Sequence, residues 1–128
     1  MENMEFDYFY GSENEQYLFI QIPLMLIRDA KFKNLSNDAK ILYSLMLDMT
    51  KLSNNNGWRD EQGRAYIIYT QKQIMSDLNC HKEKVSKTLK ELIEFDLLES
   101  KFVGLGQPNR MYVKNLAVSI LEKNLVKW

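Results

Sequence analysis

The sequence predicts an α+β domain in which several helices precede a small antiparallel hairpin, and three observations support this class. Apolar residues recur at helical spacing in three successive segments of the chain. Two shorter segments are rich in β-branched and aromatic residues, which is typical of strands. A loop with two glycines and a proline separates two more strand-like segments, and this composition indicates a hairpin.

Size and composition indicate one globular domain without a membrane span. The chain has 128 residues, of which 45% are hydrophobic and 27% charged, enough for a single core. Five acidic residues and no basic residue occur in residues 1–16, so we interpret 1–16 as an acidic N-terminal arm and 17–128 as the domain. The single cysteine, Cys80, excludes an internal disulfide and favours a reducing cytoplasm. The apolar stretches are too short to cross a bilayer, so we expect no membrane partner.

The first half of the domain is expected to hold a strand and one long helix. Side chains alternate from Tyr17 to Ile22, which predicts an extra N-terminal strand. The segment from Pro23 to Asp29 is predicted to form a short helical turn, because proline is favoured at a helix start. Ser36 is the expected N-cap of a helix over 37–52, and the polar run 53–57 is expected to stop it.

A second strand and a short, well-capped helix follow. Residues 64–69 are predicted to form the strand. Thr70 and Gln73 have the spacing of a capping box, which predicts a helix that begins there and continues to Leu78. Asn79 tolerates left-handed backbone geometry and suits a tight turn before the next helix.

The last elements complete a recognisable order. A helix is predicted over 82–95, a hairpin from strands 97–103 and 110–114, and a C-terminal helix over 117–127. The order helix, strand, helix, tight turn, helix, hairpin is that of a winged helix-turn-helix. Here an extra N-terminal strand precedes that order and a C-terminal helix follows it. The inward residues of helix 82–95 are expected to be Val85, Leu89, Leu92 and Ile93.

The helix over 82–95 is the candidate for entering the major groove of DNA. Residues 82–90 contain four lysines and one glutamate, although the whole chain has no net charge. With roughly 100° per residue and Val85 as zero, Lys87 and Lys90 fall at roughly 140° to 200°, away from the buried side. Lys84 falls at roughly 260°, also away from the core. The charge pattern alone favours an ordinary solvated helix face, whereas the helix-turn-helix order and the hairpin that follows favour DNA.

Two other places are expected to extend this contact. The start of helix 70–78 presents free N–H groups to a phosphate, although capping is the safer role for Thr70. The hairpin tip has glycines that allow close approach and polar residues that reach phosphates or the minor groove, but it also fits an ordinary mobile hairpin. The candidate DNA-binding residues are Thr70, Gln71, Lys72, His81, Lys82, Lys84, Ser86, Lys87, Lys90, Lys101, Gln107, Asn109 and Arg110.

Catalysis finds little support in the sequence. Cys80 and His81 are neighbours, and a nucleophile and its base are normally built across a fold rather than side by side in sequence. One cysteine and one histidine do not make a structural zinc site, and the chain contains no phosphate-binding glycine motif. We therefore expect no catalytic residue, no metal and no cofactor. His81 is expected to cap the next helix or to face a phosphate.

An aromatic cluster near the N-terminus allows several interpretations. It comprises Tyr8, Phe9, Tyr10, Tyr17 and Phe19. These rings fit a core, an arm that reaches a partner subunit, or a stacking platform for single-stranded nucleic acid. The surrounding acidic residues argue against the platform, because they would repel the nucleic acid backbone.

Several runs in this order resemble a known family. They are 19–23 (FIQIP), 35–43 (LSNDAKILY), 57–60 (GWRD), 64–70 (RAYIIYT) and 85–92 (VSKTLKEL). Each run alone is weak evidence for a family. The combination is similar to the N-terminal domain of the replication initiator protein A family of theta-replicating plasmids in Gram-positive bacteria. The resemblance extends over about residues 15–116.

The resemblance implies a homodimeric winged-helix domain that recognises repeated sites in double-stranded plasmid origin DNA. Family members are longer and have a C-terminal part thought to engage host replication proteins. A chain that stops at Trp128 is therefore expected to be a truncated or an unusually short member, without that host contact. Two alternatives stay open: a winged-helix transcriptional regulator, and a dimerisation or protein-interaction module that does not bind DNA.

Overall fold

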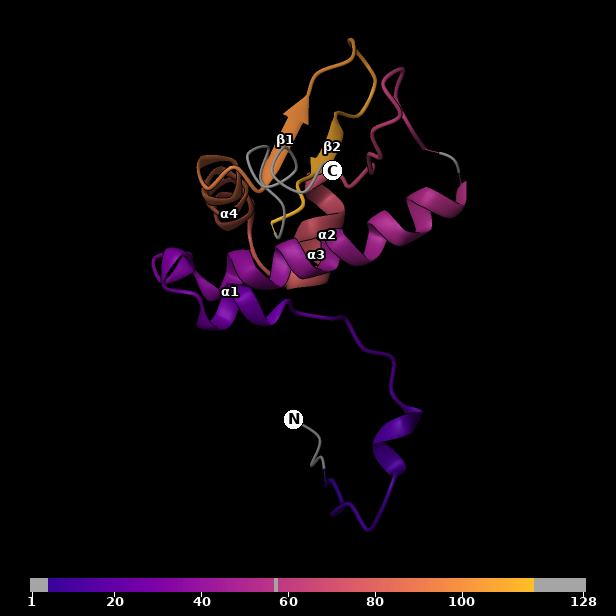
Figure 1. Cartoon of the computed structure of the whole chain (residues 1–128), viewed down its shortest axis with the longest axis vertical. Helices are drawn as coiled ribbons and strands as arrows, with labels where there is room; N and C mark the ends of the chain where they lie inside the picture. The colour runs from indigo at the N-terminus through magenta and orange to yellow at the C-terminus, as the bar shows by residue number, and fades with distance from the viewer. Residues whose placement is uncertain (1–4, 57, 117–128) are drawn as a thin grey trace, which may run out of the picture.

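The structure, a computed structural model, describes residues 5–56 and 58–116. It consists of helices and one small sheet of two antiparallel strands (Figure 1). The elements in chain order are η1 (Glu13–Gln16), α1 (Leu24–Arg28), η2 (Ala30–Phe32), α2 (Asn37–Asn56), α3 (Gln71–Leu78), α4 (Lys82–Glu94), β1 (Leu98–Lys101) and β2 (Arg110–Val113). The helix expected over 117–127 lies outside the described residues.

The extra N-terminal strand is absent from the described residues. Residues 17–23 form neither a strand nor a helix, and Leu18, Ile20 and Ile22 are all solvent-exposed. Alternation alone does not make a strand, because the backbone also needs a neighbouring strand with which to exchange hydrogen bonds. Residues 5–22 instead run away from the packed helices (Figure 1).

The short helical turn after Pro23 is confirmed as α1. Pro23 is the N-cap of α1, and Leu26 is the fully buried residue of this helix. The carboxylate of Asp29 then accepts a hydrogen bond from the backbone N–H of Lys31 (3.0 Å) and so begins η2. Phe32, at the end of η2, is buried and brings this region onto the core.

The long helix α2 begins as expected but continues further. The hydroxyl of Ser36 accepts a hydrogen bond from the backbone N–H of Ala39 (3.1 Å), which confirms Ser36 as the cap. The helix continues through Asn56, so the expected stop at 53 was wrong. Serine and asparagine cost a helix less than about 1 kcal/mol each, and an established helix can extend over them.

The expected strand at 64–69 is reduced to two isolated bridges. Ile67 pairs with Met111 through two backbone hydrogen bonds of 2.8 and 2.9 Å, and Arg59 pairs with Ala65. This extended segment therefore lies alongside β2 without becoming a full strand of the sheet. Ile67 and Tyr69 nevertheless point inwards and are buried.

The core lies between α2, α4 and the hairpin. It is built mainly from aliphatic side chains of these elements, and Tyr43 is the largest fully buried member. The Tyr43 hydroxyl donates to the carbonyl oxygen of Lys114 (2.5 Å), and burial raises the pKa of this tyrosine. The buried hydrophobic cluster comprises Leu26, Phe32, Leu35, Ala39, Leu42, Tyr43, Met46, Ile67, Tyr69, Ile74, Val85, Leu92, Leu97, Leu98 and Met111. Among the described residues, no helix combines the length and the apolar character that a membrane span requires.

Candidate DNA-binding surface

The helix pair α3 and α4 forms as the sequence predicts. Thr70 and Gln73 make both hydrogen bonds of a capping box at the start of α3. Asn79 ends α3 with a left-handed backbone (φ 50°), which allows the tight turn into α4. His81 occupies the N-cap position of α4, but its side chain makes no capping hydrogen bond there.

Two side-chain contacts fix α3 in place. The amide of Gln71 donates to the hydroxyl of Ser86 on α4 (3.0 Å). The hydroxyl of Tyr69 donates to Asp77 (2.5 Å), and burial together with this bond raises the pKa of Tyr69. The first turn of α3 therefore lies directly beside the exposed side of α4.

The exposed side of α4 carries the predicted cations, but its buried side differs from the expectation. Val85 and Leu92 are buried as expected, whereas Ile93 is 46% exposed and was placed wrongly. Thr88 is buried instead, because its hydroxyl bonds to the carbonyl oxygen of Lys84 (2.7 Å) and needs no outside partner. The candidates Lys82, Lys84, Ser86, Lys87 and Lys90 are all exposed.

Lys84 is held apart from the other lysines of α4. Its ammonium group lies 2.9 Å from a carboxylate oxygen of Asp38 in the first turn of α2. This hydrogen bond and the charge of Asp38 raise the pKa of Lys84. Lys87 and Lys90, together with Ser86, occupy roughly 100° to 200° on the helix, opposite Val85, so they form a separate group.

Glu91 also joins α4 to α2. One carboxylate oxygen accepts from the backbone N–H of Ser36 (2.9 Å), and the other accepts from the hydroxyl of Ser36 (2.7 Å). The sequence alone suggests that Glu91 would repel DNA phosphates near the end of this helix. The structure shows that its carboxylate is directed at the N-terminus of α2, where the helix dipole favours a negative charge.

The register of the hairpin assigns its polar residues to two faces. Ser100 pairs with Met111, and Lys101 pairs with Arg110. Because successive strand residues alternate, Ser100 and Met111 share the face towards α3 and α4, while Lys101 and Arg110 share the opposite face. The amide of Asn109 donates to the Ser100 hydroxyl (3.3 Å), on the first of these faces.

An open cavity of about 340 Å³ lies where α3, α4 and the hairpin meet. It brings together candidate residues that the sequence separates by almost forty positions, namely Thr70 and Gln71 with Asn109. The lining residues are Tyr69, Thr70, Gln71, Leu89, Ser100, Pro108, Asn109 and Met111.

Arg110 packs on aromatic rings at the other face of the hairpin. Its guanidinium lies 4.5 Å from the centre of the Tyr66 ring, which in turn stacks on Trp58 at 6.4 Å. The guanidinium of Arg64 lies 5.1 Å from the ring of Tyr112 in the same way. These contacts fasten the loop over 58–66 to β2, and both this loop and the hairpin tip project from the same end of the molecule (Figure 1).

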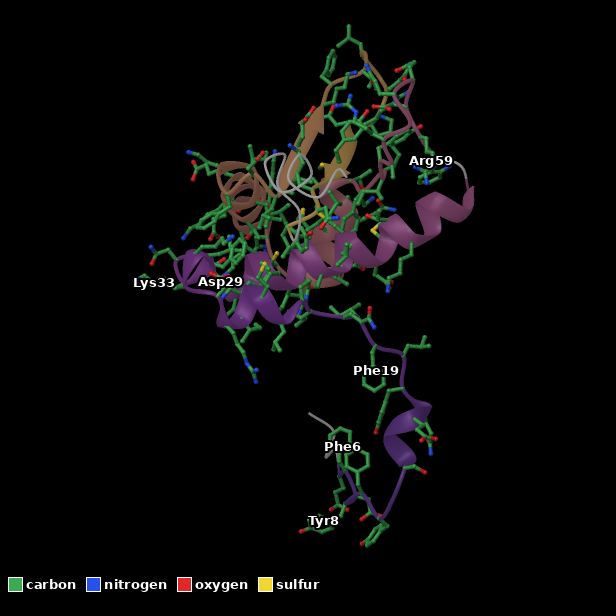
Figure 2. All side chains as sticks on the ribbon, in the orientation of Figure 1. Phe6, Tyr8, Phe19, Asp29, Lys33 and Arg59 are labelled. Atoms are coloured by element: carbon green, nitrogen blue, oxygen red, sulfur yellow. The ribbon has the colours of Figure 1, made fainter. Side chains whose placement is uncertain are left out.

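Asp60 organises that loop. Its carboxylate accepts from the backbone N–H groups of Gln62 and Arg64 and from Nε of Arg64 (2.9 Å). Burial raises the pKa of Asp60, but the hydrogen bonds from Arg64 and Gln62 outweigh it and lower the pKa to about 2. Arg59, labelled in Figure 2, closes the turn by donating to the carbonyl oxygen of Gly63 (2.9 Å).

The remaining candidates lie at the edges of this arrangement. Lys72 is exposed in the first turn of α3, and Gln107 is exposed at the hairpin tip, where its backbone N–H bonds to Gly104 (3.3 Å). Sequence reasoning missed Trp58, Arg64 and Tyr66 as partners of the hairpin, since no spacing pattern connects them with Arg110. Within the part of the chain that the structure describes, no three metal-binding side chains of the His, Cys, Asp or Glu type are grouped together.

Several solved structures have a fold similar to that of this chain. The chain superimposes on a structure described as the N-terminal domain of a DNA binding protein (TM-score 0.72, 36% identity, 97% of this chain and 98% of that one). It also matches a Rep–DNA complex (TM-score 0.72, 37% identity, 95% and 98%). A structure of an MDR initiator is similar too (TM-score 0.69, 34% identity, 94% and 95%).

Sequence comparison agrees with these structures. A "41 kDa protein" of Lactobacillus helveticus is 30% identical over 93 residues, which are 73% of this chain and 26% of that protein. The chain thus spans about a quarter of the length of this relative. Residues 18–126 match the family described as the N-terminus of Replication initiator protein A (RepA). The alignment covers most of the chain, and the chain belongs to this RepA N-terminal family.

Proposed function

We propose that this chain binds double-stranded DNA at repeated sites in a plasmid replication origin, in the cytoplasm and without any chemical step. One observation carries the proposal. The start of α3, Leu89 of α4 and Asn109 of the hairpin line one open cavity, and Gln71 beside it bonds to Ser86 of α4. The exposed lysines Lys87 and Lys90 lie on the same helix as Ser86. A helix-turn-helix that contacts DNA uses these same parts, with the second helix in the major groove. The similar Rep–DNA complex supports a DNA partner.

The proposed docking is that of a winged helix-turn-helix. Helix α4 enters the major groove, and Lys87 and Lys90 contact phosphates or guanine edges. The start of α3 offers its N–H groups to a phosphate. The hairpin acts as the wing, with Asn109 towards the helix pair, Gln107 at the tip, and Lys101 and Arg110 on the opposite face.

Lys84 has a smaller role in this proposal than its sequence position suggests. Its charge is balanced by Asp38 at 2.9 Å, so little counterion release is expected from any phosphate that it meets. His81, Lys82 and Lys72 remain as contacts at the edges of the surface.

The full initiator function is proposed only for longer proteins. We infer that the chain acts as a homodimer, because repeated sites in origin DNA are suited to a protein with two equivalent DNA-binding domains. Contacts with host replication proteins are proposed to lie in the part of longer relatives that this chain does not match.

Fluorescence anisotropy with an origin duplex and a scrambled duplex, each over a salt series, tests the proposal. We expect tight binding to the origin duplex and weaker, steeply salt-dependent binding to the scramble. Each phosphate contact contributes about 0.9 to the slope of log affinity against log salt, so Lys87→Ala with Lys90→Ala should reduce the slope by about 1.8 per subunit.

Lys51→Ala is the matched control, because Lys51 is an exposed lysine of α2 that bonds to Gln21 (3.1 Å) and is absent from this surface. Its slope should equal that of the unmodified chain. Equal, weak binding to both duplexes would contradict specific recognition and favour a protein-interaction module.

A further inference from the structure

The N-terminal segment over residues 5–22, called the arm below, exposes a large apolar surface. Phe6 is 86% exposed, Tyr8 82% and Phe9 61%. Figure 2 shows Phe6 and Tyr8 at the far end of the arm, well away from the packed helices. These rings therefore lie outside the core of the described residues, and large exposed apolar side chains grouped in one segment indicate an interaction site.

The arm has some order of its own. The ring of Tyr17 meets Phe9 edge to face at 6.4 Å and meets Phe19 at 6.2 Å. The carboxylate of Asp7 accepts from the backbone N–H of Tyr8 (2.8 Å). Within the arm, therefore, Phe9, Tyr17 and Phe19 pack edge to face, and acidic residues lie between the aromatic residues in the sequence.

A second exposed surface, which we call the α1 face, consists of two apolar residues of α1 and the basic residues that follow them. Leu24 and Ile27, three residues apart on one side of α1, are 57% and 55% exposed. Basic side chains follow at Arg28, Lys31 and Lys33. Figure 2 shows Lys33 at this end of the molecule, far from Phe6.

We propose that the arm of one copy of the chain lies on the α1 face of a second copy, and that the second copy returns the same contact. The aromatic rings of the arm cover the aliphatic pair of the α1 face. Acidic residues of the arm, such as Glu5 and Asp7, lie near Lys31 and Lys33. This inference gives the proposed homodimer its surface and so rests on that part of the proposed function.

Charge and area both favour a second copy as the occupant. Residues 1–16 contain five acidic residues and no base, whereas residues 28–33 contain three bases and one acid. In a reciprocal exchange, the acidic arm of each copy lies near the basic residues of the other copy. The same contact then occurs twice, as the closed symmetry of a dimer requires. Each aromatic side chain can bury about 150–250 Å², so three rings from each arm bury roughly 900–1,500 Å² in all before aliphatic contacts are counted. Standard stable interfaces bury about 1,200–2,000 Å².

Sedimentation equilibrium of the 128-residue chain without DNA tests the exchange. We expect a mass of twice 15.2 kDa for the unmodified chain. The triple variant Phe6→Ser, Tyr8→Ser, Phe9→Ser should have the monomer mass of 15.2 kDa at the same concentration. A matched control replaces two exposed apolar residues of the hairpin loop, Phe102→Ser with Leu105→Ser, and should stay dimeric.

Reversing the charges on both surfaces separates a lost contact from a folding defect, because only a lost contact can be restored by the second reversal. The double variant Lys31→Glu, Lys33→Glu should weaken the dimer, and the further changes Glu5→Lys and Asp7→Lys should restore it. A dimeric triple variant, or a failure of the restoring changes, would overturn the arm exchange while the homodimer stands. A monomeric unmodified chain would overturn both, whereas the anisotropy experiment tests DNA binding separately.

Discussion

Replacement of Glu91 by alanine tests the link that holds α4 against α2. Both carboxylate oxygens of Glu91 accept hydrogen bonds from Ser36, at 2.9 and 2.7 Å. A hydrogen bond to a charged group contributes about 1.5–3 kcal/mol, and the half-buried setting lets water replace part of the lost pair. We therefore expect Glu91→Ala to lower the free energy of unfolding by about 2 kcal/mol.

Urea denaturation followed by circular dichroism measures this loss. Glu94→Ala is the matched control, because Glu94 is an exposed glutamate of the same helix, and we expect a change within about 0.5 kcal/mol. Combining Glu91→Ala with Ser36→Ala should show a coupling energy of about 1 kcal/mol, since the two residues share one of the bonds.

The same residue separates two explanations of its role at the DNA surface. If Glu91 faced phosphates, Glu91→Gln would tighten DNA binding by removing a repulsive charge. Because its carboxylate is directed at Ser36, we expect the affinity and the salt slope of Glu91→Gln to equal those of the unmodified chain. Tighter binding, or an unfolding free energy for Glu91→Ala equal to that of Glu94→Ala, would contradict a structural role for the Glu91–Ser36 contact.

Three further predictions follow from single contacts. Lys84→Ala should reduce the salt slope of DNA binding less than Lys87→Ala does, because Asp38 already balances the charge of Lys84; equal reductions would contradict this. Thr70→Ala removes the capping box and should lower the free energy of unfolding, measured by urea denaturation, by about 1 kcal/mol. Thr70→Ser should retain most of the stability that the cap contributes. The pKa of Asp60 is lowered from 3.8 to about 2, so the stability that this carboxylate contributes is present above its unfolded pKa and is lost as the pH falls towards 2. Unfolding free energies over an acid series should show this loss, and Asp60→Asn should abolish that part of the pH dependence.

Local sequence signals predicted the helix pair accurately. The capping box at Thr70, the left-handed Asn79 and the start of α4 at Lys82 all lie where the sequence indicates. Each of these features depends on hydrogen bonds or backbone preferences within a few residues, so the sequence alone is sufficient to predict it. The hairpin loop was predicted for the same reason, since Gly104 and Gly106 adopt the positive φ angles that its turns require.

Predictions that depended on a distant partner were less successful. The alternating segment over 17–22 found no neighbouring strand and stayed extended. Ile93 is exposed although it continues the apolar stripe, and Thr88 is buried because its hydroxyl bonds within the helix. Helical spacing gives the angle of a side chain about its own axis, but burial depends on which other element packs there.

The helix pair, the caps that delimit α3 and the concentration of lysines on α4 follow from the sequence alone, because these are properties of neighbouring residues. Only the tertiary structure decided which charges remain available to a partner. It pairs Lys84 with Asp38 and Glu91 with Ser36, which lies 55 positions away in the chain. It also sends Arg110 to the face opposite Asn109 through the register of two strands. A salt bridge, a cap from another helix and a strand register each require two segments to meet, and only packing of the whole chain brings them together.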